Sequence, residues 1–161
     1  MEADLLGKQD AVSLDKNDVI ILKMLQEDCK VSLKEIGEKT GLSSSTVHYR
    51  VNRLIEEEVI TGFKACVDPV KVGKEMLAIA LITGRYGPDY SKKIGEKLAK
   101  IQGVWAVYFL LGNIDFAVLL RASSRDELKS IVDSFIRIDE VERSNTYLIL
   151  ERRKEDLTVQ L

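Results

Sequence analysis

Side chains that could bind a polar, charged polymer gather in one short stretch, residues 41–54, GLSSSTVHYRVNRL. Val47, Val51 and Leu54 repeat at the spacing of a buried helix face. The other positions are rich in serine, threonine, histidine, tyrosine, asparagine and arginine, whereas an ordinary exposed face favours glutamate and lysine, which are better helix formers. Short, oriented hydrogen-bonding groups suit base edges and phosphates. The pattern favours a helix that contacts nucleic acid over a plain solvated helix.

The polar side chains of this stretch fall opposite the apolar stripe or on its flanks when each residue turns by about 100°. Arg50 and Arg53 add guanidinium groups that can bind phosphate or guanine. Free N–H groups at the start of the helix, near Ser44 and Ser45, can also hold a phosphate. The predicted DNA-binding residues are Ser43, Ser44, Ser45, Thr46, His48, Tyr49, Arg50, Asn52 and Arg53.

The overall charge does not by itself indicate a nucleic-acid binder, because the 161 residues carry a formal net charge of −2. Residues 29–55, however, hold five bases and two acids, which gives a local charge of +3. A basic patch of this size suits a protein that needs dimerisation or other partners to hold DNA firmly. With 45% hydrophobic residues, the chain can also bury a core.

Metal, disulfide and membrane chemistry find little support in the sequence. His48 is the only histidine, and Cys29 and Cys66 lie far apart and outside any CxxC motif. Residues 1–18 hold no apolar run of signal-peptide length, and no later stretch approaches about 18 uninterrupted apolar residues. We expect a cytoplasmic protein with no membrane association, no metal and no cofactor.

The first 60 residues are predicted to form a winged or plain helix-turn-helix domain built from three helices. Ser32 and Glu35 form a capping box, and Gly41 stops the second helix just before the third begins. Such a short, glycine-bearing break is typical of the helix-turn-helix motif. Residues 61–74 follow as a linker strand, because Phe63, Ala65 and Val67 alternate with polar residues. The predicted helices run over 14–28, from Ser32 to Gly41, and from Ser43 to about residue 58.

Residues 75–161 alternate strand and helix twice, in the order βαββαβ. This order predicts a ferredoxin-like domain, so the whole chain is expected to be an α+β protein. Only Asn113 and Ile114 separate the two central strands, which predicts a tight hairpin. Both helices would cover one sheet face, and the other, apolar face would pack against a second copy of the chain. The predicted strands are 76–86, 104–112, 115–123 and 144–152, and the predicted helices are 89–101 and 124–138.

The segment GNID, residues 112–115, is the second informative stretch. A carboxylate is unusual at the start of a strongly apolar strand, yet Asp115 stands there. Asp115 could accept hydrogen bonds from its own loop, or it could bind an ammonium group. The residues alone leave both roles open.

From about Leu14 to Leu150 the chain resembles the Lrp/AsnC family, the feast/famine regulators of bacteria and archaea. The densest match covers residues 41–73, GLSSSTVHYRVNRLIEEEVITGFKACVDPVKVG. LLGNIDFAVLL (110–120) and VERSNTYLIL (141–150) match as well. One departure is Glu58, which stands where the family usually ends the recognition helix with glycine, so that helix is expected to end differently here.

The resemblance implies a C-terminal effector domain, often called RAM, whose sheets pair face to face in a homodimer, with dimers assembling into octamers. It also implies an effector that is an amino acid or a close relative, held between dimers near the Gly-x-x-Asp turn. Carried over to this sequence, that turn is Gly112, Asn113, Ile114 and Asp115. Tyr86, Ser123, Ser124 and Arg125 lie at strand ends that could reach the same pocket.

We therefore predict a sequence-specific transcriptional regulator that binds double-stranded DNA and responds to an amino acid or related small molecule. Two alternatives are an architectural DNA-binding protein without a ligand and an amino-acid-sensing regulatory subunit of an enzyme. The second of these leaves the polar helix unexplained. An enzyme is not expected, because the chain lacks both G-x-x-x-x-G-K-[ST] and H-E-x-x-H.

Overall fold

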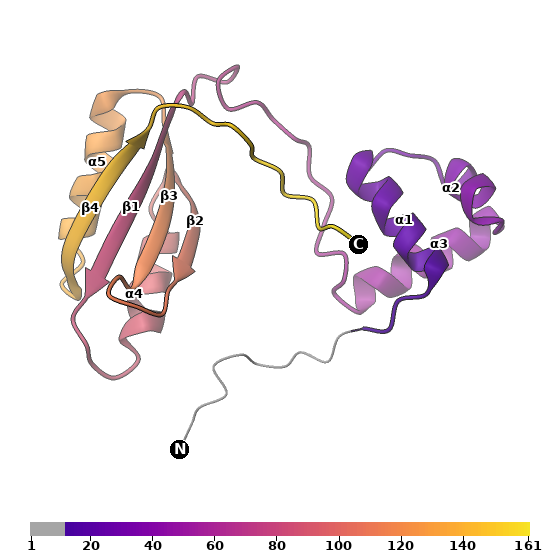
Figure 1. Cartoon of the computed structure of the whole chain (residues 1–161), viewed down its shortest axis with the longest axis horizontal. Coiled ribbons are helices and arrows are strands. Elements are labelled where there is room, and N and C mark those ends of the chain that lie inside the picture. Colours follow the sequence, from indigo (N-terminus) through magenta and orange to yellow (C-terminus); the bar gives the residue numbers. More distant parts are fainter. Residues whose placement is uncertain (1–11) are drawn as a thin grey trace. The chain divides into compact units, whose positions relative to one another are not determined.

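The computed structural model describes residues 12–161, which divide into two compact units (Figure 1). The first unit runs to Cys66 and includes Asp156–Leu161, and the second is Val67–Glu155. Residues 1–11 lie outside the described residues. They include most of the segment 1–18, in which no signal peptide was predicted, and the start of the predicted domain 1–60. Among residues 12–161, no helix combines the length and apolar content needed to cross a membrane.

The end of the chain belongs to the first unit, whereas the sequence assigned all of 75–161 to the second domain. Two reciprocal hydrogen bonds account for this difference. The side-chain amide of Gln26 donates to the carbonyl oxygen of Val159 at 3.1 Å, and the N–H of Val159 donates to Gln26 Oε1 at 2.6 Å. The side-chain amide of Gln26 thus exchanges two hydrogen bonds with the backbone of Val159, in the way that paired residues of neighbouring strands do.

Three helices make up the regular structure of the first unit, as predicted: α1 (Lys16–Glu27), α2 (Leu33–Thr40) and α3 (Ser44–Glu56). Each begins with an oxygen-bearing N-cap. Asp15 and Ser32 form capping boxes with Asp18 and Glu35, and Ser43 accepts the N–H of Thr46. Their apolar stripes meet in one core, formed by Ile21, Leu22, Ile36, Val47, Val51 and Leu54.

Two glycines make the short turn between α2 and α3 possible. Gly41 has a φ of +73°, a left-handed conformation that glycine adopts without strain, and its N–H donates to the carbonyl oxygen of Gly37 at 2.8 Å. A Cβ atom at Gly37 would lie 2.6 Å from the carbonyl oxygen of Leu42. The backbone that leads into α3 therefore packs directly on α2, which fixes the tight helix-turn-helix geometry.

The predicted linker strand at 61–74 is absent, because the described residues between α3 and Met76 contain only turns and irregular backbone. The alternation of Phe63, Ala65 and Val67 is real, but Phe63 and Val67 are both exposed. A strand needs a neighbour that pairs with its backbone N–H and C=O groups, and no strand pairs with this segment in the described chain. Alternation alone was therefore insufficient evidence for a strand.

The second unit has the predicted βαββαβ order, which confirms the ferredoxin-like domain and the α+β class. All neighbouring strands are antiparallel, and the sheet order is β2-β3-β1-β4. Both helices pack on the same face of the sheet (Figure 1). The elements are β1 (Met76–Gly84), α4 (Tyr90–Ala99), β2 (Val104–Phe109), β3 (Phe116–Ala122), α5 (Arg125–Ile136) and β4 (Val141–Ile149).

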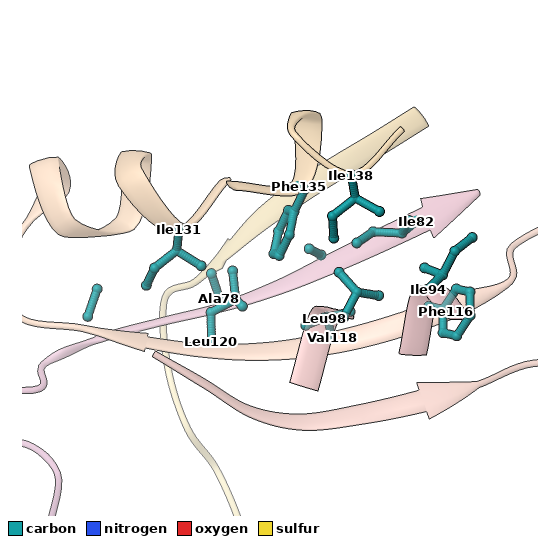
Figure 2. Close-up of a cluster of buried hydrophobic side chains, with 12 residues drawn as sticks. Ala78, Ile82, Ile94, Leu98, Phe116, Val118, Leu120, Ile131, Phe135 and Ile138 are labelled. Atoms are coloured by element: carbon teal, nitrogen blue, oxygen red, sulfur yellow. The ribbon is translucent and has the colours of Figure 1, made fainter. Parts of the chain in front are cut away.

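The core of this unit lies between the sheet and the two helices, as Figure 2 shows. Alternate residues of β1 and β3 point into it, with Ala78 opposite Leu120 and Ile82 opposite Phe116 in the register. The helices contribute Ile94 and Leu98 from α4 and Ile131 and Phe135 from α5. Alternation along the strands leaves a second sheet face with no helix on it. We call this the open face, and it carries Leu77, Ile79, Leu81, Trp105, Tyr108, Leu119, Tyr147 and Ile149.

Several predicted boundaries differ from the structure, most clearly at the final strand and at the central hairpin. The final strand begins at Val141 rather than at residue 144, because β4 is an edge strand on which polar side chains such as Glu142 stay in solvent. The predicted two-residue hairpin is wrong as well, since six residues separate β2 from β3. The N–H of Leu110 donates to the carbonyl oxygen of Asp115 at 2.7 Å, which closes this longer loop.

Candidate functional site

The third helix presents one polar, solvent-exposed side. Its apolar residues Val47, Val51 and Leu54 are buried, as their spacing predicted. On the opposite side, Tyr49 has 68% of its surface exposed. The exposed members of the predicted set are Ser43, Ser44, Ser45, His48, Tyr49 and Asn52, while Thr46, Arg50 and Arg53 are half-buried.

Hydroxyl groups cluster where this helix begins. The Ser43 hydroxyl lies 2.9 Å from that of Ser45 and 2.8 Å from that of Thr46. One turn further along, the Asn52 amide nitrogen lies 3.5 Å from His48 Nδ1. The first-turn N–H groups of a helix point out along its axis and carry partial positive charge. This end of α3 therefore offers hydroxyl and N–H groups of the kind that hold phosphate.

Arg50 and Arg53 have partners that the sequence analysis did not foresee. Arg50 Nη1 donates to Asp18 Oδ1 at 2.9 Å and to Asp15 Oδ2 at 2.6 Å. Arg53 Nη2 donates to Asp18 Oδ2 at 2.7 Å. The two guanidinium groups predicted to bind DNA thus face carboxylates of α1. A signal was present in the sequence, because Asp18 precedes Ile21 and Leu22 by three and four residues, which places it on the buried side of the helix.

These ion pairs change the electrostatics of the unit. The hydrogen bonds that Arg50 donates to Asp15, and then to Asp18, raise the pKa of Arg50 above its ordinary value, and the bond that Arg53 donates to Asp18 raises the pKa of Arg53. The pKa of Asp15 is lowered, first by the N–H of Asp18 and then by Arg50. Two of the five bases counted between residues 29 and 55 are therefore matched by Asp15 and Asp18 of the first helix and its cap. The basic patch is weaker than the local charge suggested.

The carboxylate of Asp115 is held inside the second unit. Only 4% of the residue is exposed. Its Oδ2 accepts the N–H of Gly84 at 2.8 Å, and its Oδ1 accepts the hydroxyl of Tyr90 at 3.2 Å. Burial, and then the Asp115 charge, raise the pKa of Tyr90. Both carboxylate oxygens of Asp115 therefore accept hydrogen bonds from the end of β1 and from α4, rather than from the loop of Asp115 itself.

Tyr86 lies at the same end of the sheet as the 112–115 turn, because the last residues of β1 pair with the first of β3. It is 76% exposed and begins a row of aromatic rings. Centroids are 5.0 Å apart between Tyr86 and Tyr90, 6.1 Å between Tyr90 and Phe109, and 5.4 Å between Phe109 and Phe116. Beside this row, Gly112 and Asn113 are exposed and Ile114 is half-buried.

Within one chain, the structure does not bring Ser123, Ser124 and Arg125 together with Tyr86 and the 112–115 turn. These residues follow the last residue of β3, which pairs with Met76 at the opposite end of the sheet. They form the start of α5 instead. Ser124 Oγ accepts the N–H of Glu127 at 3.1 Å, and Glu127 accepts the N–H of Ser123 at 2.7 Å and binds Lys74 Nζ at 2.5 Å. The Lys74 ammonium and the hydroxyl and N–H of Ser123 lower the pKa of Glu127 from 4.5 to about 2.

A three-helix unit with an exposed polar third helix, joined to a ferredoxin-like unit, is the architecture of a DNA-binding regulator with a separate ligand-binding domain. Residues 14–61 match the family model described as winged helix-turn-helix DNA-binding, and residues 77–159 match the Lrp/AsnC ligand binding domain. The chain belongs to the Lrp/AsnC family of DNA-binding transcriptional regulators, which are not enzymes.

Known relatives share nearly the whole chain. The HTH-type transcriptional regulator FL11 of Pyrococcus abyssi is 39% identical over 144 residues, which are 89% of this chain and 94% of that protein. The feast or famine regulatory protein of M. tuberculosis, solved in complex with L-methionine, has a TM-score of 0.82 at 28% identity and covers 91% of this chain and 99% of its own. The fold of E. coli AsnC is similar too, with a TM-score of 0.81 at 23% identity over 89% of this chain and 97% of that chain.

Proposed function

We propose that this regulator reads double-stranded DNA with the exposed side of α3, and that an amino acid or a close relative modulates its DNA binding or its assembly. The observation that carries the proposal is the division of α3 into a buried apolar stripe and an opposite polar side. A helix of this kind fits a major groove about 12 Å wide, where side chains meet base edges. Ser45, His48, Tyr49 and Asn52 are the proposed reading residues.

DNA binding by α3 is tested with Tyr49→Ala. Tyr49 is exposed and its side chain makes no hydrogen bond within residues 12–161, so its loss removes contact surface without disturbing the core. Lys23→Ala is the control, because Lys23 is an exposed base on α1 that lies beside Gln26 and the terminal residues 158–161. Fluorescence anisotropy with a duplex selected by the wild-type protein from a random pool should show at least a tenfold loss for Tyr49→Ala and less than twofold for Lys23→Ala. If Tyr49→Ala binds DNA with the same affinity as the wild type, the proposal that the exposed side of α3 contacts DNA is wrong.

The open face is proposed as the homodimer interface. It carries apolar and aromatic side chains, with Trp105, Tyr108, Tyr147 and Ile149 exposed in the single chain. Exposed apolar surface of this extent favours burial against a partner. A dimer would present two α3 helices to successive major grooves, with half-sites about 34–36 Å apart. Further assembly of dimers into octamers is part of the proposal.

Assembly is tested by light scattering after gel filtration. Ile79→Lys places a charge in the middle of the open face and should yield monomers. Ile136→Lys is the control, since Ile136 is an equally apolar residue, 75% exposed, on α5 rather than on the open face. If Ile79→Lys keeps the mass of the wild-type protein, the chains associate through another surface.

The effector is proposed to bind near Tyr86 and the exposed residues of the 112–115 turn. The support is the exposed aromatic ring beside free loop backbone, together with the L-methionine complex of the M. tuberculosis relative. A thermal-shift screen of the common amino acids identifies the ligand, because one that binds only the folded protein raises its melting temperature. Tyr86→Ala and Asn113→Ala should reduce that shift, while Arg125→Ala, at the other end of the sheet, should preserve it. If only Arg125→Ala loses the ligand-induced rise in melting temperature, the effector binds near the start of α5 instead.

A further inference from the structure

Asp18 is a buried carboxylate with three hydrogen-bond donors. It is 1% exposed, and Asp115 is the one other charged residue buried to this degree among residues 12–161. The N–H of Asp15 donates to Asp18 Oδ2 at 3.1 Å, and Arg50 and Arg53 donate at 2.9 and 2.7 Å. A buried charge is tolerated only when it is paired and hydrogen-bonded. Asp18 therefore requires both arginines in place.

The two arginines come from successive turns of α3. Three residues separate Arg50 from Arg53, so both project from the same side of the helix and are about 4.5 Å apart along its axis. Because each binds a different oxygen of Asp18, a rotation of α3 about its axis or a slide along α1 would break at least one bond. Asp15 adds a third fixed point through its contact with Arg50.

We propose that Asp18 is a positioning residue for DNA reading: it sets the rotation of α3 on α1 through Arg50 and Arg53, and so determines which side chains of α3 face the bases. This inference rests on the proposed role of α3. It reassigns the two arginines from phosphate binding to the junction between the helices. The exposed side chains of α3 then discriminate between DNA sequences. Their orientation toward the bases depends on Asp18, which is buried and does not contact DNA.

The test compares Asp18→Asn with the wild-type full-length protein. The amide keeps the size of the carboxylate but loses the charge that holds two guanidinium groups. The probes are the duplex selected by the wild-type protein and a shuffled duplex of the same composition. Once circular dichroism shows that the variant is folded, the ratio of the two dissociation constants should fall at least fivefold. The salt dependence should steepen by about 0.9 in log–log slope for each released arginine that reaches a phosphate.

Glu38→Gln is the matched control for a change in charge. Glu38 is an exposed carboxylate on α2 whose partner, Lys34, lies 3.9 Å away, so the variant removes one negative charge without touching Asp18. Its discrimination ratio should stay within twofold of the wild type. A folded Asp18→Asn that also stays within twofold overturns the inference.

Arg53→Gln answers the question if Asp18→Asn fails to fold, because Asp18 keeps its bond to Arg50 in that variant. A junction role predicts a lower discrimination ratio with an unchanged salt slope. A phosphate-binding role predicts an unchanged ratio and a slope smaller by about 0.9, and this result would overturn the inference. If Tyr49→Ala binds DNA as well as the wild type, the proposed function of α3 fails. If Tyr49→Ala loses binding while Asp18→Asn keeps its ratio, only the positioning role fails.

Discussion

The backbone N–H of Gly84 donates a hydrogen bond of 2.8 Å to the buried carboxylate of Asp115, which joins the end of β1 to the start of β3. The N–H of Asp115 in turn donates to the carbonyl oxygen of Ile82 at 3.0 Å, and the hydroxyl of Tyr90 reaches its other carboxylate oxygen. One aspartate thus links two strands and α4 at the end of the sheet where the 112–115 turn lies. Buried Asp115 therefore anchors the turn, while Gly112 and Asn113 remain exposed to solvent and accessible to a ligand.

Asp115→Ala is expected to destabilise the second unit by about 1–3 kcal/mol, because the N–H of Gly84 would stay buried without an acceptor. Tyr90→Phe is the milder comparison. It removes the longer bond, of 3.2 Å, but leaves the acceptor of Gly84 in place, so a loss of about 1 kcal/mol or less is expected. Urea denaturation followed by Trp105 fluorescence measures both. Equal stabilities of Asp115→Ala and the wild type would show that water replaces the carboxylate.

Glu127 should make the second unit sensitive to acid. Its pKa is about 2 in the folded protein and near 4.5 when unpaired. A group whose folded pKa is depressed contributes stability that is fully present above the unfolded pKa and is lost as the pH falls towards the folded value. The loss is therefore expected between about pH 4.5 and pH 2. In urea denaturation at pH values from 7 down to 2, Glu127→Gln should be less stable than the wild type at pH 7, and the difference in stability should shrink as the pH falls below about 4.5. If the difference in stability between Glu127→Gln and the wild type does not change with pH, packing rather than the Glu127 charge accounts for it.

Gly37→Ala should destabilise the helix-turn-helix even though alanine is the better helix former by about 1 kcal/mol. The new Cβ atom would lie 2.6 Å from the carbonyl oxygen of Leu42, and a backbone atom cannot move aside without opening the turn. Gly95→Ala in α4 is the control, since its Cβ would meet Phe116 at an ordinary 3.6 Å. Amide hydrogen exchange should show faster opening of α2 and α3 in the first variant only. Slower exchange in Gly37→Ala would mean that the turn has room.

Local patterns predicted most of the elements, because caps and apolar spacing act over a few residues. Ser32, Ser43 and Ser124 cap helices as expected, and Val47, Val51 and Leu54 are buried. The linker strand at 61–74 failed for a physical reason, since a strand depends on a neighbour that its own sequence does not specify. The final strand was misplaced because polar residues are acceptable on an edge.

The surroundings of the candidate site residues could not be predicted from local patterns, because they depend on contacts between distant segments. Arg50 and Arg53 look like DNA ligands until Asp18, more than thirty residues earlier, is placed beside them. Ser123 follows the same strand that Asp115 precedes, but the strand runs the length of the sheet and separates them. Strand direction could have revealed that separation, whereas the arginine pairing required the packing of α1 on α3.

Glu58, at the position where the family resemblance led us to expect glycine, adopts a left-handed backbone conformation that favours glycine. Its φ is +56°, in the left-handed region, and the helix ends there with the N–H of Ile60 bonded to the carbonyl oxygen of Leu54 at 2.9 Å. Side chains are strained in this region, so Glu58→Gly should stabilise the first unit by about 0.5–1 kcal/mol. Glu57→Gly should instead destabilise it by a similar amount. Glu57 has a φ of −82°, so glycine relieves no backbone strain there and only raises the conformational entropy of the unfolded chain. Urea denaturation monitored by circular dichroism compares the two, and stabilisation by both substitutions would point to charge rather than backbone strain.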